Sequence, residues 1–189
     1  MRLKGSTAPA WAAAVLADLD SFLRDHAACE RKASASAMSF VAHYPDRREL
    51  VRACIDLACE ELEHFRQVHR RMDERGLRLG PDVRNAYMAR LAREFREGSH
   101  AYFLDRLLTA GIAEARGCER FGLLGAALPE GELRDFYRAL ARTEVRHQEV
   151  YLDLARTYFA AEDIARRLER LLDVEAQIIG SLPVRAALY

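Results

Sequence analysis

The chain has 189 residues, half of them hydrophobic, which is enough to bury one substantial core and suits one domain better than two. Its 29 basic and 29 acidic residues balance, which excludes a protein coated in positive charge. No run of 18 apolar residues occurs and the N-terminus lacks the apolar segment of a secretory signal, so we expect a soluble, cytoplasmic protein with no membrane partner.

Glycine and proline number only 10 and 5, and Ala, Leu, Arg and Glu dominate, so an all-α fold is predicted. No segment shows the apolar and polar alternation of a half-buried strand. In chain order, helices are expected at about residues 18–41, 47–75, 82–96, 100–127, 131–159 and 162–180.

The expected helix ends have local causes. Asp18 or Asp20 can cap the first helix, and Asp46 with Glu49 resembles a capping box at the start of the second. Gly76 is expected to end the second helix.

Four of the predicted helices are long, and they are joined by two tight turns, near Pro45 and Pro129, and by one long connection with its own helix. This pattern is typical of a ferritin-like four-helix bundle with a crossover connection and extra flanking helices. A single domain covering residues 1–189 is predicted.

A Glu-x-x-His motif occurs on two of the long helices, as Glu61 with His64 and as Glu144 with His147. Residues three apart lie on one face of a helix, so each pair can approach a metal ion from one side. Glu97 and His100 have the same spacing, but the Gly98-Ser99 break makes a shared helical face between them unexpected.

A binuclear site in a bundle core needs one further carboxylate from each partner helix, at the same height as the motif. The separation along the chain between Glu30 and Pro45 is nearly the same as that between Pro45 and Glu61. The separation between Glu114 and Pro129 equals that between Pro129 and Glu144. The chain is therefore interpreted as two helical hairpins that each supply half of a dimetal site.

Two further side chains near these positions need an interpretation. Glu119 lies closer to Pro129 than Glu114 does, so it would miss the height of Glu144 by roughly 7 Å at ~1.5 Å per residue, and we expect it at the surface or behind the ligands. His26, one turn before Glu30, either supports the site from behind or packs at the edge of the core, and we favour the core edge.

Four converging glutamates are untenable without cations. Two divalent ions would neutralise them, and neutral imidazoles would complete the ligand set. Carboxylate and imidazole ligands in a helical bundle favour iron or manganese. The predicted metal ligands are Glu30, Glu61, His64, Glu114, Glu144 and His147, with no catalytic residue beyond them.

A di-iron site of this kind can store iron, destroy peroxide or insert oxygen into a substrate. The doubled motif speaks against ferritin-type storage. The four cysteines form no C-x-x-C pair, so a rubredoxin domain, common among peroxide-reducing relatives, is not expected. Oxygen insertion is favoured, and the other two outcomes stay open.

The stretches "DHAACERKAS" (25–34), "EELEHFRQV" (60–68), "GIAEARGCERF" (111–121) and "EVRHQEVYLDLA" (144–155) together resemble the bacterial tRNA-(2-methylthio-N6-isopentenyladenosine) hydroxylase family of ferritin-like, non-haem di-iron monooxygenases. The resemblance implies that the six ligands named above match the iron-ligand positions. It further implies O₂-dependent hydroxylation of the isopentenyl side chain of a modified adenosine in the tRNA anticodon loop, with two irons and electrons from a reductase or ferredoxin.

Phosphate contacts to tRNA could come from two sets of arginines on helix faces, although such arginines usually pair with neighbouring Glu and Asp. These are Arg66, Arg70, Arg71, Arg75 and Arg78, and Arg134, Arg138, Arg142 and Arg146. The balanced charge leaves the tRNA substrate resting on the family resemblance. An iron-binding or peroxide-detoxifying protein remains the alternative.

Overall fold

The structure is a computed structural model that describes residues 1–189. It contains seven α-helices, one short 3-10 helix and no strand, so the predicted all-α class is confirmed. The helices fall into two compact units, each described below by itself. The single domain over residues 1–189 stays a prediction.

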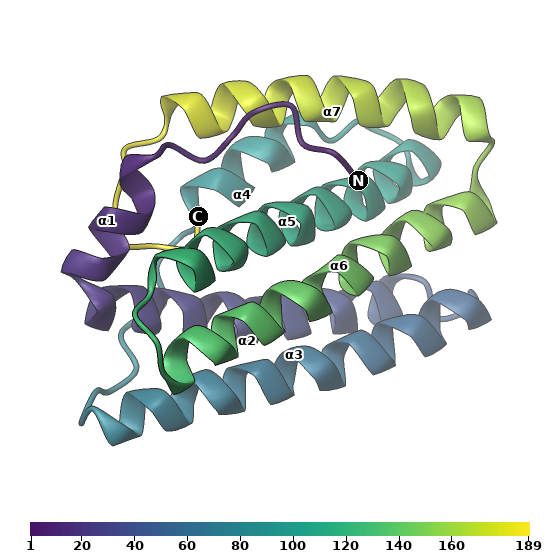
Figure 1. The fold of residues 1–189 in the computed structure, drawn as a ribbon. Helices are drawn as coiled ribbons and strands as arrows, with labels where there is room; N and C mark the ends of the chain where they lie inside the picture. Colours follow the sequence, from purple (N-terminus) through teal and green to yellow (C-terminus); the bar gives the residue numbers. More distant parts are fainter. The chain divides into compact units, whose positions relative to one another are not determined.

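One unit, Ala17–Val83 with Ala186–Leu188, is built on an antiparallel hairpin of α2 (Leu19–His43) and α3 (Arg48–Glu74) (Figure 1). Asp18 caps α2 as predicted, because its carboxylate accepts a hydrogen bond from the Ser21 backbone N–H at 3.1 Å. The cap fixes the start of the helix that carries Glu30.

The start of α3 differs from the prediction. The N-cap residue is Arg47, which makes no side-chain cap bond, so the capping box of Asp46 with Glu49 was wrong. Pro45 and the tight turn already fix where α3 begins, and Glu49 still places a negative charge in its first turn. Gly76, with φ of +68°, follows the end of α3 as expected.

The α2/α3 hairpin has a defined register. The Ser34 hydroxyl donates to the Ala58 carbonyl at 2.9 Å, across the interface between the helices. Moving four residues back along α2 and four forward along α3 places Glu30 opposite residue 62. Glu30 and Glu61 therefore lie at the same height in the hairpin.

The other unit comprises Met1–Leu16, Arg84–Arg185 and Tyr189, and contains the remaining helices. These are α1 (Ala10–Ala17), α4 (Ala86–Leu91), the 3-10 helix η1 (Ala92–Glu94), α5 (Ser99–Ala127), α6 (Glu132–Tyr158) and α7 (Ala161–Ser181). Helix α1 was not predicted, and α4 with η1 is shorter than the predicted 82–96 segment because Asn85 caps α4 through the Met88 N–H.

Helices α5 and α6 form the second antiparallel hairpin (Figure 1). Glycine allows close approach at Gly125, where a Cβ would lie 2.9 Å from Arg138 Cγ, whereas a Cβ on Gly111 would make an ordinary contact with the Gln148 carbonyl oxygen at 3.5 Å. The Gly111 contact places Glu114 opposite residue 145, one residue from Glu144.

Helix α7 packs against α4, α5 and α6, and a buried ion pair joins it to α5. The Arg116 guanidinium, with no exposed surface, donates to both carboxylate oxygens of Glu175 at 2.8 and 2.9 Å, and the Tyr87 hydroxyl donates to the same carboxylate at 3.1 Å. Because of this second layer, α5 is buried around nearly its whole circumference.

None of the helices combines the length and the apolar composition needed to cross a bilayer.

Candidate metal centre

The α2/α3 hairpin brings three of the predicted ligands together. Glu30, Glu61 and His64 are 4%, 3% and 7% exposed. His64 Nδ1 lies 3.6 Å from Glu61 Oε2 and 3.9 Å from Glu30 Oε2. One nitrogen and two carboxylate oxygens, from two helices, therefore converge on one small volume.

His26 contacts Glu30 through the carboxylate oxygen that is not the one near His64. It is fully buried, and its Nε2 lies 2.5 Å from Glu30 Oε1, whereas Glu30 Oε2 is the oxygen nearer to His64. The expected position at the core edge was therefore wrong. Burial, followed by the nearby His64, lowers the pKa of His26 to about 3, so the ring is neutral at pH 7. Its one proton is assigned to Nε2, since the carboxylate is the acceptor.

The α5/α6 hairpin repeats part of this arrangement. Glu144 and His147 are 2% and 1% exposed, and His147 Nδ1 lies 3.2 Å from Glu144 Oε2. Glu114 is half-buried on α5, at the height of Glu144 by the register of the hairpin. In both hairpins the Glu-x-x-His motif presents Nδ1 and Oε2 side by side.

These separations fit shared metal coordination. Two ligand atoms that each lie ~2.1 Å from one ion, at right angles, are ~3 Å apart. The observed pairs, at 3.2 Å and 3.6 Å, need only small side-chain adjustments to reach that value. Buried imidazole nitrogens and carboxylates without thiolates suit iron or manganese. The donor set of each hairpin therefore fits a bound divalent metal.

Glu119 and the pair of Glu97 with His100 were not expected to bind metal, and their surroundings differ from those of the predicted ligands. Glu119 accepts hydrogen bonds from the Thr7 backbone N–H at 3.1 Å and from the Thr7 hydroxyl at 2.6 Å, and pairs with Arg116. It ties the N-terminal segment to α5. Glu97 precedes Gly98, whose φ is +88°, so it lies outside the helix that contains His100, as expected.

Sequence reasoning missed a buried amide beside the motif. Gln148 follows His147 and is 6% exposed, and its Oε1 has no hydrogen-bond partner. It lies four residues after Glu144 and so shares that face of α6. The helical spacing was visible in the sequence and could have identified Gln148.

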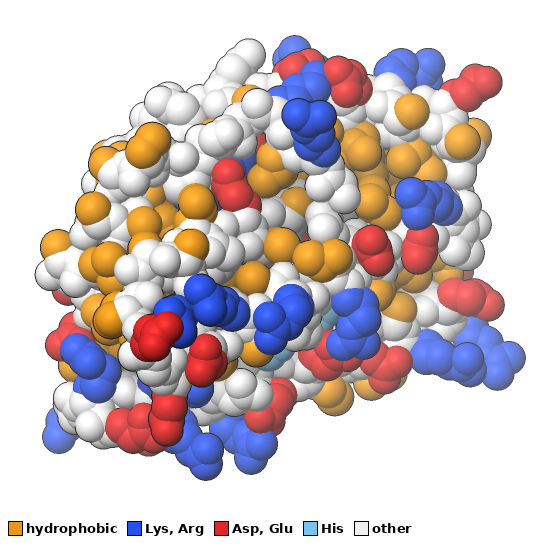
Figure 2. Space-filling model, in the orientation of Figure 1, with side chains coloured by type: hydrophobic (Ala, Val, Ile, Leu, Met, Phe, Trp, Pro, Cys, Tyr) orange, Lys and Arg blue, Asp and Glu red, His pale blue; other side chains and the backbone are white.

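Some of the helix-face arginines pair with acids, as expected, whereas Arg71 and Arg138 donate to backbone carbonyls. Arg66 lies 2.6 Å from Glu63, and Arg134 lies 3.0 Å from Glu130. Figure 2 shows basic and acidic side chains intermixed over the face that it draws. The charge pattern by itself does not identify a nucleic-acid surface.

The all-helical chain, with a Glu-x-x-His motif and a height-matched carboxylate in each of two long hairpins, is a ferritin-like protein with candidate carboxylate–histidine metal ligands. The family model described as tRNA-(MS[2]IO[6]A)-hydroxylase (MiaE) matches residues 1–187, and the chain belongs to this family of tRNA hydroxylases. The resemblance that the sequence motifs indicate is thereby confirmed.

Two curated relatives agree with this family. The chain is 40% identical over 175 residues to the tRNA 2-(methylsulfanyl)-N(6)-isopentenyladenosine(37) hydroxylase of Pseudomonas putida, covering 93% of this chain and 85% of that protein. It is 35% identical over 157 residues to the protein of the same name from Salmonella typhimurium, covering 83% of this chain and 57% of that protein.

A solved structure shares the fold. It is described as protein 43 with aldehyde deformylating oxygenase activity from Synechococcus. The TM-score is 0.93 with 37% sequence identity, over 98% of this chain and 93% of that chain. The predicted ferritin-like class is confirmed.

Proposed function

We propose that the protein is a cytoplasmic di-iron monooxygenase that hydroxylates the isopentenyl side chain of 2-methylthio-N6-isopentenyladenosine in the tRNA anticodon loop. The observation that carries this proposal is the pairing of family membership with the twice-repeated, buried Glu-x-x-His geometry. Both relatives named above carry this nucleoside in their names.

Six side chains are proposed to hold two irons, and the hairpins would combine as the halves of one centre. The α2/α3 hairpin would contribute Glu30, Glu61 and His64, and the α5/α6 hairpin would contribute Glu114, Glu144 and His147. Bound iron would supply O₂ activation for oxidation of an unreactive C–H bond. The chain's part is to hold the ligand atoms in place and exclude water.

The reaction needs an external electron donor because of its stoichiometry. Inserting one oxygen atom into a C–H bond and reducing the other to water consumes O₂, two electrons and two protons. We propose that a reductase or ferredoxin supplies these electrons. The adenosine must also leave its stack to bring its side chain to a buried centre.

The test uses the full chain loaded with iron, chemical reductant, O₂ and tRNA that carries the isopentenyl nucleoside. We expect two irons per chain and conversion of the nucleoside to its hydroxylated form, measured by mass spectrometry of digested tRNA. Glu114→Ala and His147→Ala should each lower turnover at least 100-fold and reduce bound iron. Glu149→Ala is the matched control, since Glu149 is exposed on the same helix as Glu144 and His147 and should retain wild-type turnover.

Full activity in both ligand variants would overturn the proposed centre. Oxygen or peroxide consumption that is independent of tRNA would instead favour the iron-binding or peroxide-detoxifying alternative.

A second candidate substrate is an aldehyde, because the solved structure with the same fold is described by aldehyde deformylating activity. The same iron-loaded protein would be given such an aldehyde and assayed for hydrocarbon and formate. Product from the aldehyde, with none from tRNA, would replace the tRNA proposal.

A further inference from the structure

A hollow opens on the unit that contains α5, away from the predicted ligands. It has a volume of about 470 Å³ and is lined by Phe95, Arg96, Glu97, Gly98, Ser99 and Tyr102. The hollow therefore lies over the segment that leads into α5, and combines two aromatic rings with a guanidinium.

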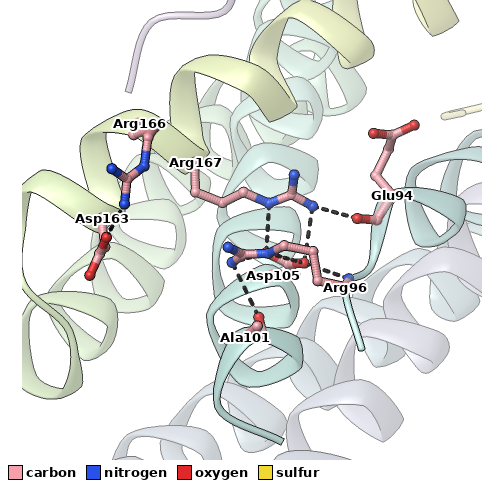
Figure 3. Close-up of polar contacts among 7 residues, drawn as sticks. All are labelled: Glu94, Arg96, Ala101, Asp105, Asp163, Arg166 and Arg167. Carbon is pink, nitrogen blue, oxygen red and sulfur yellow. Dashed lines mark hydrogen bonds and ion pairs between the residues drawn. The ribbon is translucent and has the colours of Figure 1, made fainter. Parts of the chain in front are cut away.

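The guanidinium in this hollow is held in one orientation. Arg96 Nε and Nη2 donate to the carboxylate of Asp105, which has no exposed surface, with the shortest contact at 2.7 Å (Figure 3). The Arg96 backbone N–H donates to the same carboxylate at 2.8 Å. Arg167 Nε approaches Asp105 from α7 at 2.7 Å. Arg96 Nη1 takes part in none of these bonds, and the side chain remains 43% exposed.

The aromatic rings of the hollow are also fixed. Phe95 and Tyr102 meet edge to face with ring centroids 5.5 Å apart. Tyr102 is 39% exposed, and the Arg106 guanidinium lies 5.9 Å from its ring centroid. An exposed ring that is braced at its edge and flanked by cations can stack against a planar base at little entropic cost.

We propose that this hollow binds an unpaired nucleotide of an RNA loop, with the base against Tyr102 and Phe95 and the phosphate on Arg96. This inference rests on the proposed function and adds a recognition site for the tRNA substrate. An arginine already ordered by a buried carboxylate loses little freedom when it meets a phosphate.

The bound nucleotide is a different nucleotide of the loop from the reacting one. Tyr102 precedes Glu114 by more than three turns of α5, which is ~18 Å along the helix at ~1.5 Å per residue. One nucleotide cannot occupy both places. The hollow would therefore fix the position of the loop while the modified adenosine reaches the metal.

The acidic side chain at the rim of the hollow, Glu97, allows a test in which RNA affinity should rise. Glu97 lines the hollow and is exposed, so its charge opposes a phosphate. Removing that charge with Glu97→Gln should tighten RNA binding, whereas a hollow that only packs the segment before α5 would give no such gain.

The experiment measures binding of a fluorescent anticodon stem-loop RNA to the iron-loaded full chain, without oxygen, so that no turnover occurs. We expect Arg96→Ala to weaken binding about tenfold and to reduce the salt slope by ~0.7. Tyr102→Ala, which leaves the Asp105 contacts in place, should weaken binding at least about fivefold with an unchanged slope. The control is Arg93→Ala, an exposed arginine outside the hollow, expected to stay within about twofold.

The proposal that the hollow binds a nucleotide would be overturned if Arg96→Ala and Tyr102→Ala both bound RNA as tightly as the wild type. An equal loss of affinity in Arg93→Ala, or no RNA binding by the wild type, would also overturn it. Circular dichroism melting establishes that each variant is folded. Because binding is measured without turnover, loss of the hollow is distinguished from failure of the hydroxylation assay, and each proposal can fail alone.

Discussion

Nε2 of His26 lies 2.5 Å from Oε1 of Glu30, and both side chains are buried within the α2/α3 hairpin. This contact fixes the carboxylate so that its other oxygen faces His64. A partner that orients a ligand strengthens metal binding although it never touches the ion. We expect His26→Leu to lower iron affinity 10- to 100-fold, measured by equilibrium dialysis with metal analysis.

The matched control for His26 is His69→Leu. His69 is also on the α2/α3 hairpin, but it is half-exposed and lies 3.2 Å from Asp73. It should leave iron affinity unchanged. Equal affinities for wild type and His26→Leu would show that Glu30 needs no support from His26.

The sequence predicted the fold and the matched heights of the glutamates in each hairpin because both depend on short-range periodicity. Glu30 and Glu61 could be matched by counting from Pro45, since an antiparallel hairpin converts residue number into height. The contact of His26 with Glu30 was within reach for the same reason, as residues four apart share a face.

Other features depended on long-range packing or lacked a periodic signal. The pair of Arg116 and Glu175 joins residues 59 positions apart, so no local pattern could reveal it. Helix α1, "AWAAAVLA", is apolar on every side and shows no amphipathic pattern. Asn85, by contrast, is a capping residue whose signal was present and overlooked.

Asp105 joins the segment before α5 to α7 and should make stability depend on pH. Burial would raise the pKa of its carboxyl, but hydrogen bonds from Arg96 and then Arg167 outweigh burial and lower the pKa below its ordinary value of 3.8. A lowered folded-state pKa contributes stability that is present above pH ~4 and is lost as pH falls below the folded pKa.

We therefore expect Asp105→Asn to cost about 3 kcal/mol of unfolding free energy at pH 7, because two guanidinium groups lose their buried counterion. Urea unfolding at pH 7 and at about pH 3.5 checks this, and the difference between variant and wild type should shrink at the lower pH. A difference that is constant with pH would contradict the ion-pair explanation.

Gln148 should limit stability, because its buried Oε1 has no hydrogen-bond partner. A buried acceptor without a donor costs about 1–3 kcal/mol. Gln148→Met keeps the length of the side chain and removes the polar atoms, so the metal-free protein should gain about 1 kcal/mol, a rise of roughly 2–4 °C in Tm. Thermal melting checks this, with Gln67→Met as the control.

Gln67 differs from Gln148 in that its side-chain amide is already hydrogen-bonded. Its Nε2 donates to Glu63 at 2.9 Å, so replacing it removes a made hydrogen bond and should not raise Tm. A fall in Tm for Gln148→Met would mean that its amide has a partner in solution.

Two glycines on α5 test how closely α5 and α6 approach each other. A Cβ on Gly125 would lie 2.9 Å from Arg138 Cγ and 3.2 Å from the Arg138 backbone nitrogen, whereas a Cβ on Gly122 would meet nothing within 4 Å.

Alanine at Gly122 should therefore stabilise the helix by up to about 1 kcal/mol, since only the entropy cost of glycine is removed. Alanine at Gly125 should destabilise by about 1–3 kcal/mol, because the backbone of α6 must move away. Opposite signs of the Tm change in the two variants are the expected result, and a gain at both positions would show that the hairpin is looser than its contacts imply.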